Sequence, residues 1–206
     1  MKEWEELKET LGLIPKAGYE PSDAFLSLEE RVRLIRLKKG TALPETPMPE
    51  VYILRSGVLY CAVEQYGGAG EGTPVPVIDN ILWKPGTMYF DIHRVTESAY
   101  PVRERVIAAE DSVLLSLPIH ETDAVNRAER QLFDLYAKRH EENLTDLWTR
   151  KNVLQYMSAP ERYEWFLENY PGLIGRVQHK LIASFLNMTP VSLSRIRHRM
   201  READRG

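Results

Sequence analysis

This 206-residue sequence predicts an α+β protein: an N-terminal antiparallel β-roll of jelly-roll type, then one long helix, then an all-α domain with a helix-turn-helix. Three observations predict this fold class. Short β-rich runs fill the first half, a helical pattern with few breakers begins near Glu121, and the C-terminal stretch has the pattern of two helices joined by a tight turn. The corresponding regions are residues 1–120, 121–157 and 158–206.

The composition is that of an ordinary soluble protein. Hydrophobic residues make up 43% of the chain, no apolar run reaches the roughly 18 residues of a membrane span, and MKEWEELKET lacks the apolar core of a signal peptide. We therefore expect a cytoplasmic protein with no membrane partner. The single cysteine, Cys61, excludes an internal disulfide and a cysteine-cluster zinc or iron–sulfur site, and its apolar neighbours predict a buried side chain.

The strands of the β-roll are expected between Arg31 and Pro118. Turn signals, notably Lys39-Gly40, Ser56-Gly57 and Pro85-Gly86, separate the β-rich runs, and many short strands at close spacing predict an antiparallel sandwich or barrel. The glycine-rich stretch 67–72 has neither a following Lys-Ser/Thr nor a following helix, so we expect a hairpin connection rather than a phosphate cradle. The predicted strands are residues 31–37, 50–56, 58–65, 75–83, 87–90, 102–109 and 112–118.

The long helix is expected between Glu121 and Met157. Eight residues of this helix follow one another at alternating steps of three and four, which places them along one side of the helix, here called the seam. The seam either joins two copies of the chain or packs on the chain's own β-roll. Ser158-Ala-Pro-Glu161 has capping-box spacing, so the long helix ends there and another begins. The seam residues are Phe133, Tyr136, His140, Asn143, Leu147, Arg150, Leu154 and Met157.

The helix-turn-helix is predicted by the stretch 179–200, HKLIASFLNMTPVSLSRIRHRM. Its first helix has an apolar face that includes a small residue, Ala183, where a second helix can approach closely. Asn187 stands at the turn, because asparagine enters the left-handed backbone region at low cost. Thr189 is a good N-cap for the second helix, and Pro190 suits its first position.

The outward face of that second helix is basic. From Arg176 to Gly206 there are seven Lys/Arg and two Asp/Glu, a net charge of +5, whereas the whole chain carries −3, which leaves −8 on the other 175 residues. A basic tip on an acidic body indicates DNA binding; the alternative is a solvated basic helix face. Since helix-turn-helix proteins usually dock as two-fold pairs, a homodimer through the long helix is favoured. The predicted DNA-binding residues are Thr189, Val191, Ser192, Ser194, Arg195, His198 and Arg199.

The order of elements, with the phrases ERYEWFLENYP and IASFLNMTPVSLSRIRHRM, resembles the Crp/Fnr family of bacterial transcription regulators over nearly the whole chain, and most specifically its compact members common in Bacteroidetes. The resemblance implies a cyclic-nucleotide-binding-like jelly roll, a homodimer through the long helix, and double-stranded promoter DNA as the partner, with RNA polymerase as a further partner of an activator.

Individual positions of the second helix can be matched to the family. Arg195 falls where the family has an arginine that reaches guanine, and Thr189 and Ser192 fall where it has hydroxyls that contact phosphate or base. Val191 departs, because many relatives have a glutamate there, which accepts a hydrogen bond from cytosine; a valine methyl group could instead contact thymine. The base preference of the family therefore does not carry over.

The sensor pocket departs further from the family. Cyclic-nucleotide binders have a Gly-Glu-Leu-like segment and then an Arg-Ser/Thr pair; here Phe90 stands where close backbone approach needs glycine, and Asp91 is shorter than the ribose-binding glutamate. Glu104 separates the two nearby arginines. We predict a degenerate phosphate cassette, an unknown effector and no cofactor, with a cAMP- or cGMP-responsive regulator as the alternative. The predicted pocket residues are Tyr89, Phe90, Asp91, Arg103 and Arg105.

An enzyme on a small β-barrel, such as a metal-dependent cupin, is a remote alternative. Such a site needs several histidines and a carboxylate, and His93 is the only histidine between residues 31 and 118. His93 and Cys61 are also the only obvious axial ligands for a haem sensor. We therefore expect no enzymatic activity and no metal site.

Overall fold

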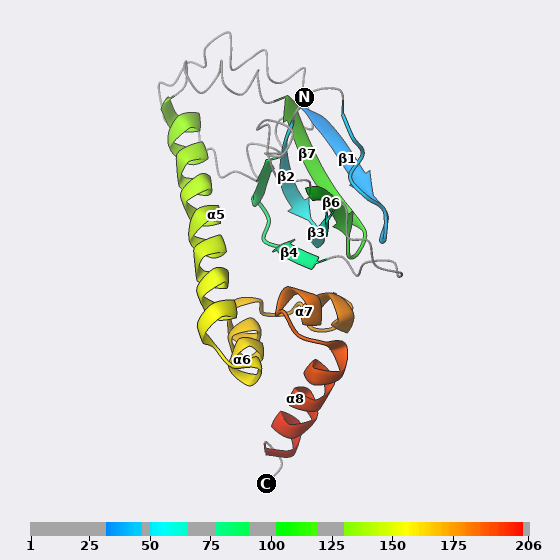
Figure 1. The fold of residues 1–206 in the computed structure, drawn as a ribbon. Helices are drawn as coiled ribbons and strands as arrows, with labels where there is room; N and C mark the ends of the chain where they lie inside the picture. Colours follow the sequence, from blue (N-terminus) through cyan, green and yellow to red (C-terminus); the bar gives the residue numbers. More distant parts are fainter. Residues whose placement is uncertain (1–31, 47–49, 66–76, 91–101, 119–129, 204–206) are drawn as a thin grey trace.

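The structure is a computed structural model that describes residues 32–46, 50–65, 77–90, 102–118 and 130–203. A β-sandwich forms one end of the molecule, helix α5 (Arg130–Tyr156) runs beside it, and three shorter helices form the other end (Figure 1). The predicted residues 121–129 of the long helix and the glycine-rich stretch 67–72 lie outside the described residues. None of the described helices is both long enough and apolar enough to cross a membrane.

The β-sandwich consists of two antiparallel sheets. One sheet has the strand order β1-β7-β2-β5, and the other has the order β4-β3-β6. Each strand predicted from the sequence is present, so the α+β class with an N-terminal β-roll is confirmed. The strands are β1 (Arg33–Leu37), β2 (Glu50–Ser56), β3 (Leu59–Gln65), β4 (Val77–Leu82), β5 (Met88–Phe90), β6 (Val102–Ala108) and β7 (Ser112–Pro118).

The predicted turn signals coincide with left-handed backbone. Gly40, Gly57 and Gly86 have φ values of 82°, 102° and 83°. Gly57 has a second constraint, because a Cβ atom at that position would lie 2.2 Å from the Ser112 Oγ and 2.6 Å from the Ser112 Cα. That hydroxyl accepts a hydrogen bond of 3.2 Å from the Val58 N–H, so the turn between β2 and β3 is fixed against β7.

The interior of the roll is an apolar cluster drawn from both sheets. Cys61 is buried there, as predicted, and burial raises the pKa of its thiol well above the ordinary value. Tyr52 and Tyr89 lie at the edge of the cluster, with ring centroids 6.2 Å apart. The buried members are Leu37, Tyr52, Leu54, Leu59, Cys61, Leu82, Val106, Ala108 and Leu114.

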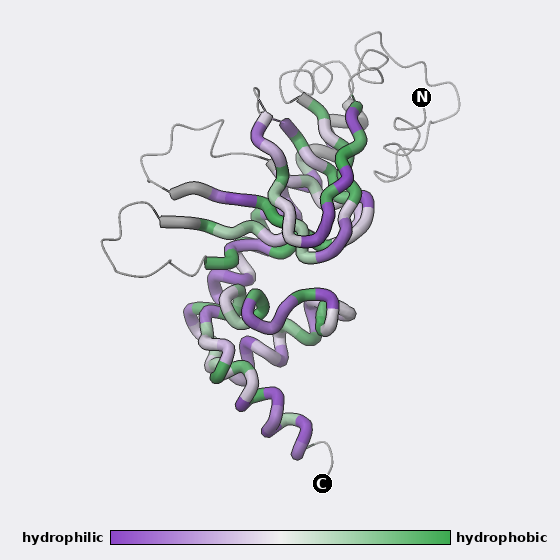
Figure 2. The backbone as a smooth tube through the Cα atoms, turned by 90° about the vertical axis from the view of Figure 1, so that its right-hand side faces the viewer, coloured by the Kyte–Doolittle hydropathy of each residue, from purple (hydrophilic) through white to green (hydrophobic). Residues whose placement is uncertain are grey.

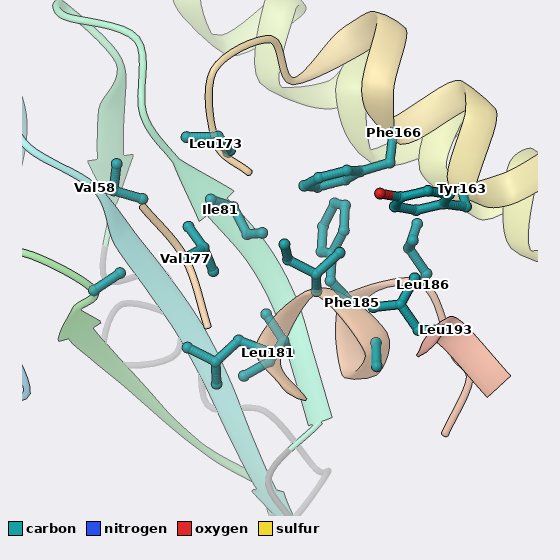
Figure 3. Packing of buried hydrophobic residues seen from close by; sticks show 14 of the residues in the cluster. Val58, Ile81, Tyr163, Phe166, Leu173, Val177, Leu181, Phe185, Leu186 and Leu193 are labelled. Atoms are coloured by element: carbon teal, nitrogen blue, oxygen red, sulfur yellow. The ribbon is translucent and has the colours of Figure 1, made fainter. Parts of the chain in front are cut away.

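A second cluster joins the outer face of the sheet β4-β3-β6 to the helices α6 (Ala159–Asn169), α7 (His179–Phe185) and α8 (Pro190–Ala203). It is rich in aromatic rings: Phe185 lies beside Phe166 (Figure 3) and also packs against Tyr170. The predicted capping box begins α6, because a Glu161 Oε2 accepts a hydrogen bond of 2.7 Å from the Ser158 N–H. The roll and the C-terminal helices therefore share one continuous core.

Helix α5 divides its predicted seam between two environments. The Asn143 side-chain amide donates to the Met88 carbonyl (3.1 Å), and Arg150 contacts β4, so for these two positions the alternative of packing on the chain's own roll is right. Leu147 of the seam is instead 43% exposed, and its neighbours Leu144 and Trp148, which are not part of the predicted seam, are 56% and 61% exposed. An apolar patch thus remains uncovered along the middle of the helix.

Candidate DNA-binding surface

The turn between α7 and α8 has the geometry that the sequence predicts. Asn187 has φ 50° and is the only non-glycine residue with positive φ in the part of the chain that the structure describes. Its N–H donates to the Ser184 carbonyl (3.0 Å), and the Met188 N–H donates to the Ala183 carbonyl (2.9 Å). The carbonyls at the end of α7 are therefore satisfied by the turn itself.

The two helices pack against each other through buried apolar side chains. Ile182, Ala183 and Leu186 are fully buried on α7, and Leu193 and Ile196 face them from α8. The absence of a bulky side chain at Ala183 permits this close approach. The predicted apolar face of the helix-turn-helix is confirmed.

The N-terminus of α8 is capped by the predicted residue. The Thr189 Oγ1 accepts a hydrogen bond of 3.1 Å from the Ser192 N–H, and the two hydroxyl oxygens lie 2.9 Å apart. Thr189 is exposed and Ser192 is half-buried. Both hydroxyls therefore hold the first turn of α8 while remaining at the surface.

The other predicted contact residues all lie on the exposed part of α8: Val191, Ser194, Arg195, His198 and Arg199. Among the described residues, Arg195 and Arg199 form no hydrogen bond or ion pair with the protein, whereas His198 Nε2 lies 3.2 Å from Glu202 Oε1. Hydrophilic residues cover much of this helix, at the tip of the molecule (Figure 2). The structure thus brings these five side chains together, one helical turn apart, on one protruding helix.

A support for the turn was missed in the sequence. Arg162 on α6 donates through Nη1 to the carbonyls of Leu186 and Asn187, both at 3.2 Å, and through Nε to the Met157 carbonyl at 2.9 Å. It therefore ties the end of α5 to the turn. No local signal marks this role, because the turn carbonyls lie 24 and 25 residues further along the chain.

A second missed contact joins the start of α7 to α8. Arg197 Nη1 lies 2.8 Å from His179 Nδ1 and also contacts His179 Nε2. Partial burial and the charges of Arg197 and Arg201 lower the pKa of His179 below its ordinary value of 6.5. A neutral imidazole can accept a hydrogen bond from the guanidinium.

The predicted sensor pocket corresponds in part to a cavity of about 460 Å³ at the edge of the roll. Tyr89 and Arg105 are on its wall, together with Tyr52, Glu45 and Glu104. Two other predicted pocket residues are placed only by their backbone: Phe90 pairs with Val51, and Arg103 pairs with Glu64. Asp91 and the candidate haem ligand His93 lie outside the described residues.

The charges of β6 alternate across the sheet. Val106 is buried in the roll interior opposite Cys61, so Glu104, two residues away, lies on the same inward face. Arg105 is exposed, and its charge acts on Tyr60 on the outer face of the sheet. Besides burial, the charge of Glu104 and a hydrogen bond to it raise the pKa of the Cys61 thiol. The inward charge of this strand is therefore a carboxylate.

Several solved structures share this architecture. A cyclic nucleotide-binding domain containing protein from Listeria monocytogenes EGD-e has a TM-score of 0.66 and 12% identity, over 98% of this chain and 91% of that one. A transcriptional regulator assigned to the Crp/Fnr family, from Eubacterium rectale, has a TM-score of 0.62 and 14% identity, over 92% and 88%. The c-di-GMP responsive global regulator CLP from Xanthomonas campestris has a TM-score of 0.61 and 11% identity, over 88% and 91%.

The chain has the fold of the Crp/Fnr regulators. The predicted resemblance is thereby confirmed at the level of the fold. No protein-family model matches the sequence, and no curated protein matches it. Identities of 11–14% leave the function of a Crp/Fnr-like chain to be argued from its own residues.

The described residues can be searched for the metal site that a cupin-like enzyme would need. Among the described residues, no group of three or more His, Cys, Asp or Glu is arranged to hold a metal ion. Cys61, one of the two haem-ligand candidates, lies in the apolar interior with its thiol pKa raised, which disfavours the thiolate that ligates iron.

Proposed function

We propose that this protein is a DNA-binding transcription regulator of Crp/Fnr type that acts as a homodimer on promoter DNA in the cytoplasm and catalyses no reaction. The observation that carries the proposal is the exposed face of α8, where Arg195 and Arg199 project without protein partners among the described residues. Guanidinium groups on the exposed face of such a helix are suited to guanine edges and phosphates in a major groove. RNA polymerase would be a further partner if the protein is an activator.

The exposed apolar patch on α5 supports the homodimer. Leu144, Leu147 and Trp148 follow one another on one side of the helix, and contiguous exposed apolar groups of this kind mark association surfaces. Asn143 and Arg150 are occupied by the chain's own roll, so the patch, rather than the full predicted seam, is the surface that we assign to the second copy.

The proposal is tested by fluorescence anisotropy of the purified protein on the duplex upstream of its own gene, against a scrambled duplex, across a salt series. We expect tighter binding to the promoter with a steep salt slope. Arg195→Ala should cost about 1–3 kcal/mol of specific binding. Arg36→Ala, which removes an exposed arginine from β1, is the matched control and should leave the affinity unchanged. Equal binding by Arg195→Ala and wild type would contradict the role of Arg195.

For the β-roll we propose a sensor that does not bind cyclic nucleotide through the usual phosphate contacts. Among the described residues, two carboxylates, Glu45 and Glu104, line the cavity with one arginine, Arg105, so a cyclic phosphate there would meet more negative than positive charge. The competing hypothesis is a cyclic-nucleotide-responsive regulator, which the names of the Listeria and Xanthomonas proteins suggest. Calorimetry with cAMP, cGMP and c-di-GMP decides between them, and saturable heat with any of the three would contradict our proposal for the roll.

A further inference from the structure

Arg150 lies at the junction of the long helix, the β-roll and the helix-turn-helix. Its Nη2 donates to the carbonyl of Ile78 on β4 (2.9 Å) and to the carbonyl of Phe185 at the end of α7 (3.1 Å). Its Nη1 donates to Asp79 Oδ1 (3.3 Å). One side chain from α5 thus contacts both of the units that flank it.

These contacts are made in a mostly buried site. The side chain of Arg150 is 13% exposed, and its carbon Cζ lies 4.7 Å from the centre of the Phe185 ring. Burial lowers the pKa of Arg150, and its Nε is buried with no hydrogen-bond partner. Burying an incompletely paired charge generally adds little net stability, whereas a planar guanidinium with several acceptors fixes the relative position of those acceptors.

The surrounding contacts hold the same two surfaces together. The Ile78 N–H donates to the Ser184 Oγ on α7 (3.1 Å), so Ile78 is bonded to the end of α7 directly and through Arg150. Arg176, in the segment before α7, forms a two-point ion pair with Glu110 of the roll. The Phe185 ring belongs to the apolar cluster that joins these two surfaces, where it lies beside Phe166 and Leu186 (Figure 3).

We propose that Arg150 is a positioning residue for DNA recognition. It fixes α7, and therefore α8, at one place relative to α5. If α5 pairs two copies of the chain, the position of α8 on α5 sets the separation of the two recognition helices, which DNA presents as the spacing of its half-sites. The inference rests on the proposed function, and it assigns to Arg150 the choice of half-site spacing rather than any contact with DNA.

The test compares three kinds of duplex after the preferred site has been selected from random sequences with the wild-type protein: the full site, a single half-site, and full sites with one or two base pairs inserted or removed between the halves. Arg150→Met should bind the single half-site within about twofold of wild type, because the reading face is remote. It should bind the full site at least about tenfold more weakly, because simultaneous engagement is lost. Its affinity should also depend less on spacing.

Arg150→Lys separates geometry from charge, since a lysine keeps the charge but cannot reach the three acceptors as a fork. It should show the same loss of spacing preference, to a smaller degree. Lys138→Met, an exposed substitution on the same helix, should behave as wild type. Half-site binding also shows whether a variant is folded. If Arg150→Met no longer binds the half-site, the inference is tested with Arg150→Lys instead. Wild-type full-site affinity and spacing profile in a variant that folds would overturn the inference, whereas failure of the wild-type protein to select any site would overturn the proposed function instead.

Discussion

The helix-turn-helix and the cavity of the β-roll differ in the charge that they present. The exposed face of α8 presents Arg195 and Arg199, whereas the described wall of the cavity combines two carboxylates, Glu45 and Glu104, with one arginine, Arg105. An anion is therefore attracted more strongly to the first site than to the second. Under our proposal, one Crp/Fnr-like fold combines a surface suited to DNA phosphate with an interior poorly suited to the phosphate of a cyclic nucleotide.

The two regions also differ in how they are held together. The interior of the roll mixes aliphatic residues with tyrosines and the Cys61 thiol. The cluster behind the helix-turn-helix instead contains stacked and edge-on rings, including Phe166, Tyr170 and Phe185. The helix-turn-helix is therefore supported by a core with more aromatic contacts than the core beside the cavity.

The largest effect is expected where this aromatic core is removed. Phe185→Ala deletes a ring that is fully buried and contacts three other rings and the Arg150 guanidinium. It should lower the free energy of unfolding by about 3–5 kcal/mol. Unfolding in guanidinium chloride, followed by tryptophan fluorescence and circular dichroism, measures this loss of stability.

The matched control lies on α6. Leu167→Ala removes a side chain that is 37% exposed and should change the free energy of unfolding by about 0.5 kcal/mol or less. If Phe185→Ala proved as mild as Leu167→Ala, the aromatic cluster would not be what stabilises the helix-turn-helix, and the comparison of the two cores would fail.

In the β-roll, Gly57→Ala tests the left-handed turn between β2 and β3 and its close approach to Ser112. The added Cβ would meet the Ser112 backbone and hydroxyl, and φ 102° is unfavourable for any other residue. We expect a loss of about 2–4 kcal/mol in the free energy of unfolding, from left-handed strain and overpacking together. Gly40→Ala has φ 82° but nothing within 4 Å of the new Cβ, so it should lose only the strain part. Equal losses in a thermal melt would show that the close approach to Ser112 is not limiting.

A region is predictable from the sequence when the residues that form it lie close together along the chain. The helix-turn-helix is predictable because Ala183, Asn187, Thr189 and Leu193 lie within one short stretch and obey local rules for caps, turns and helical spacing. The seven strands are predictable for the same reason.

The cavity and the junction depend on distant residues. The wall of the cavity combines residues 42–45 with β2, β5 and β6, and Arg150 meets acceptors 35 and 72 residues away. Nothing local distinguishes Arg150 from any other polar residue on the seam of α5. The inward position of Glu104 is predictable from the sequence, because side chains two residues apart on a strand, such as Glu104 and Val106, lie on the same face.

A smaller effect is expected at the turn between α7 and α8. Asn187 has φ 50°, so Asn187→Ala places a Cβ in the left-handed region without the local hydrogen bonding of asparagine, and should cost about 1–2 kcal/mol in the free energy of unfolding. Asn187→Gly relieves the strain and should differ from wild type by about 0.5 kcal/mol or less. Paired thermal melts of the two variants check this, and a glycine variant as unstable as the alanine variant would mean that the Asn187 side chain, rather than its backbone, holds the turn.

The smallest expected effect is the pH response of the contact between α7 and α8. Partial burial and the charges of Arg197 and Arg201 lower the pKa of His179, so between its ordinary value of 6.5 and the lowered value the folded chain binds fewer protons than the unfolded chain. Stability should therefore rise with pH through this window and be lost on acidification. Because His179 is exposed and solvent screens these charges, we expect at most about 0.5 kcal/mol.

The pKa of His179 itself is the sharper observable. An NMR titration of its ring protons should give a midpoint below 6.5, and Arg197→Met should move that midpoint upward, because the substitution removes a neighbouring positive charge. A His179 midpoint that did not respond to Arg197→Met would mean that burial alone sets it, and the contact between α7 and α8 would then contribute nothing that depends on pH through Arg197.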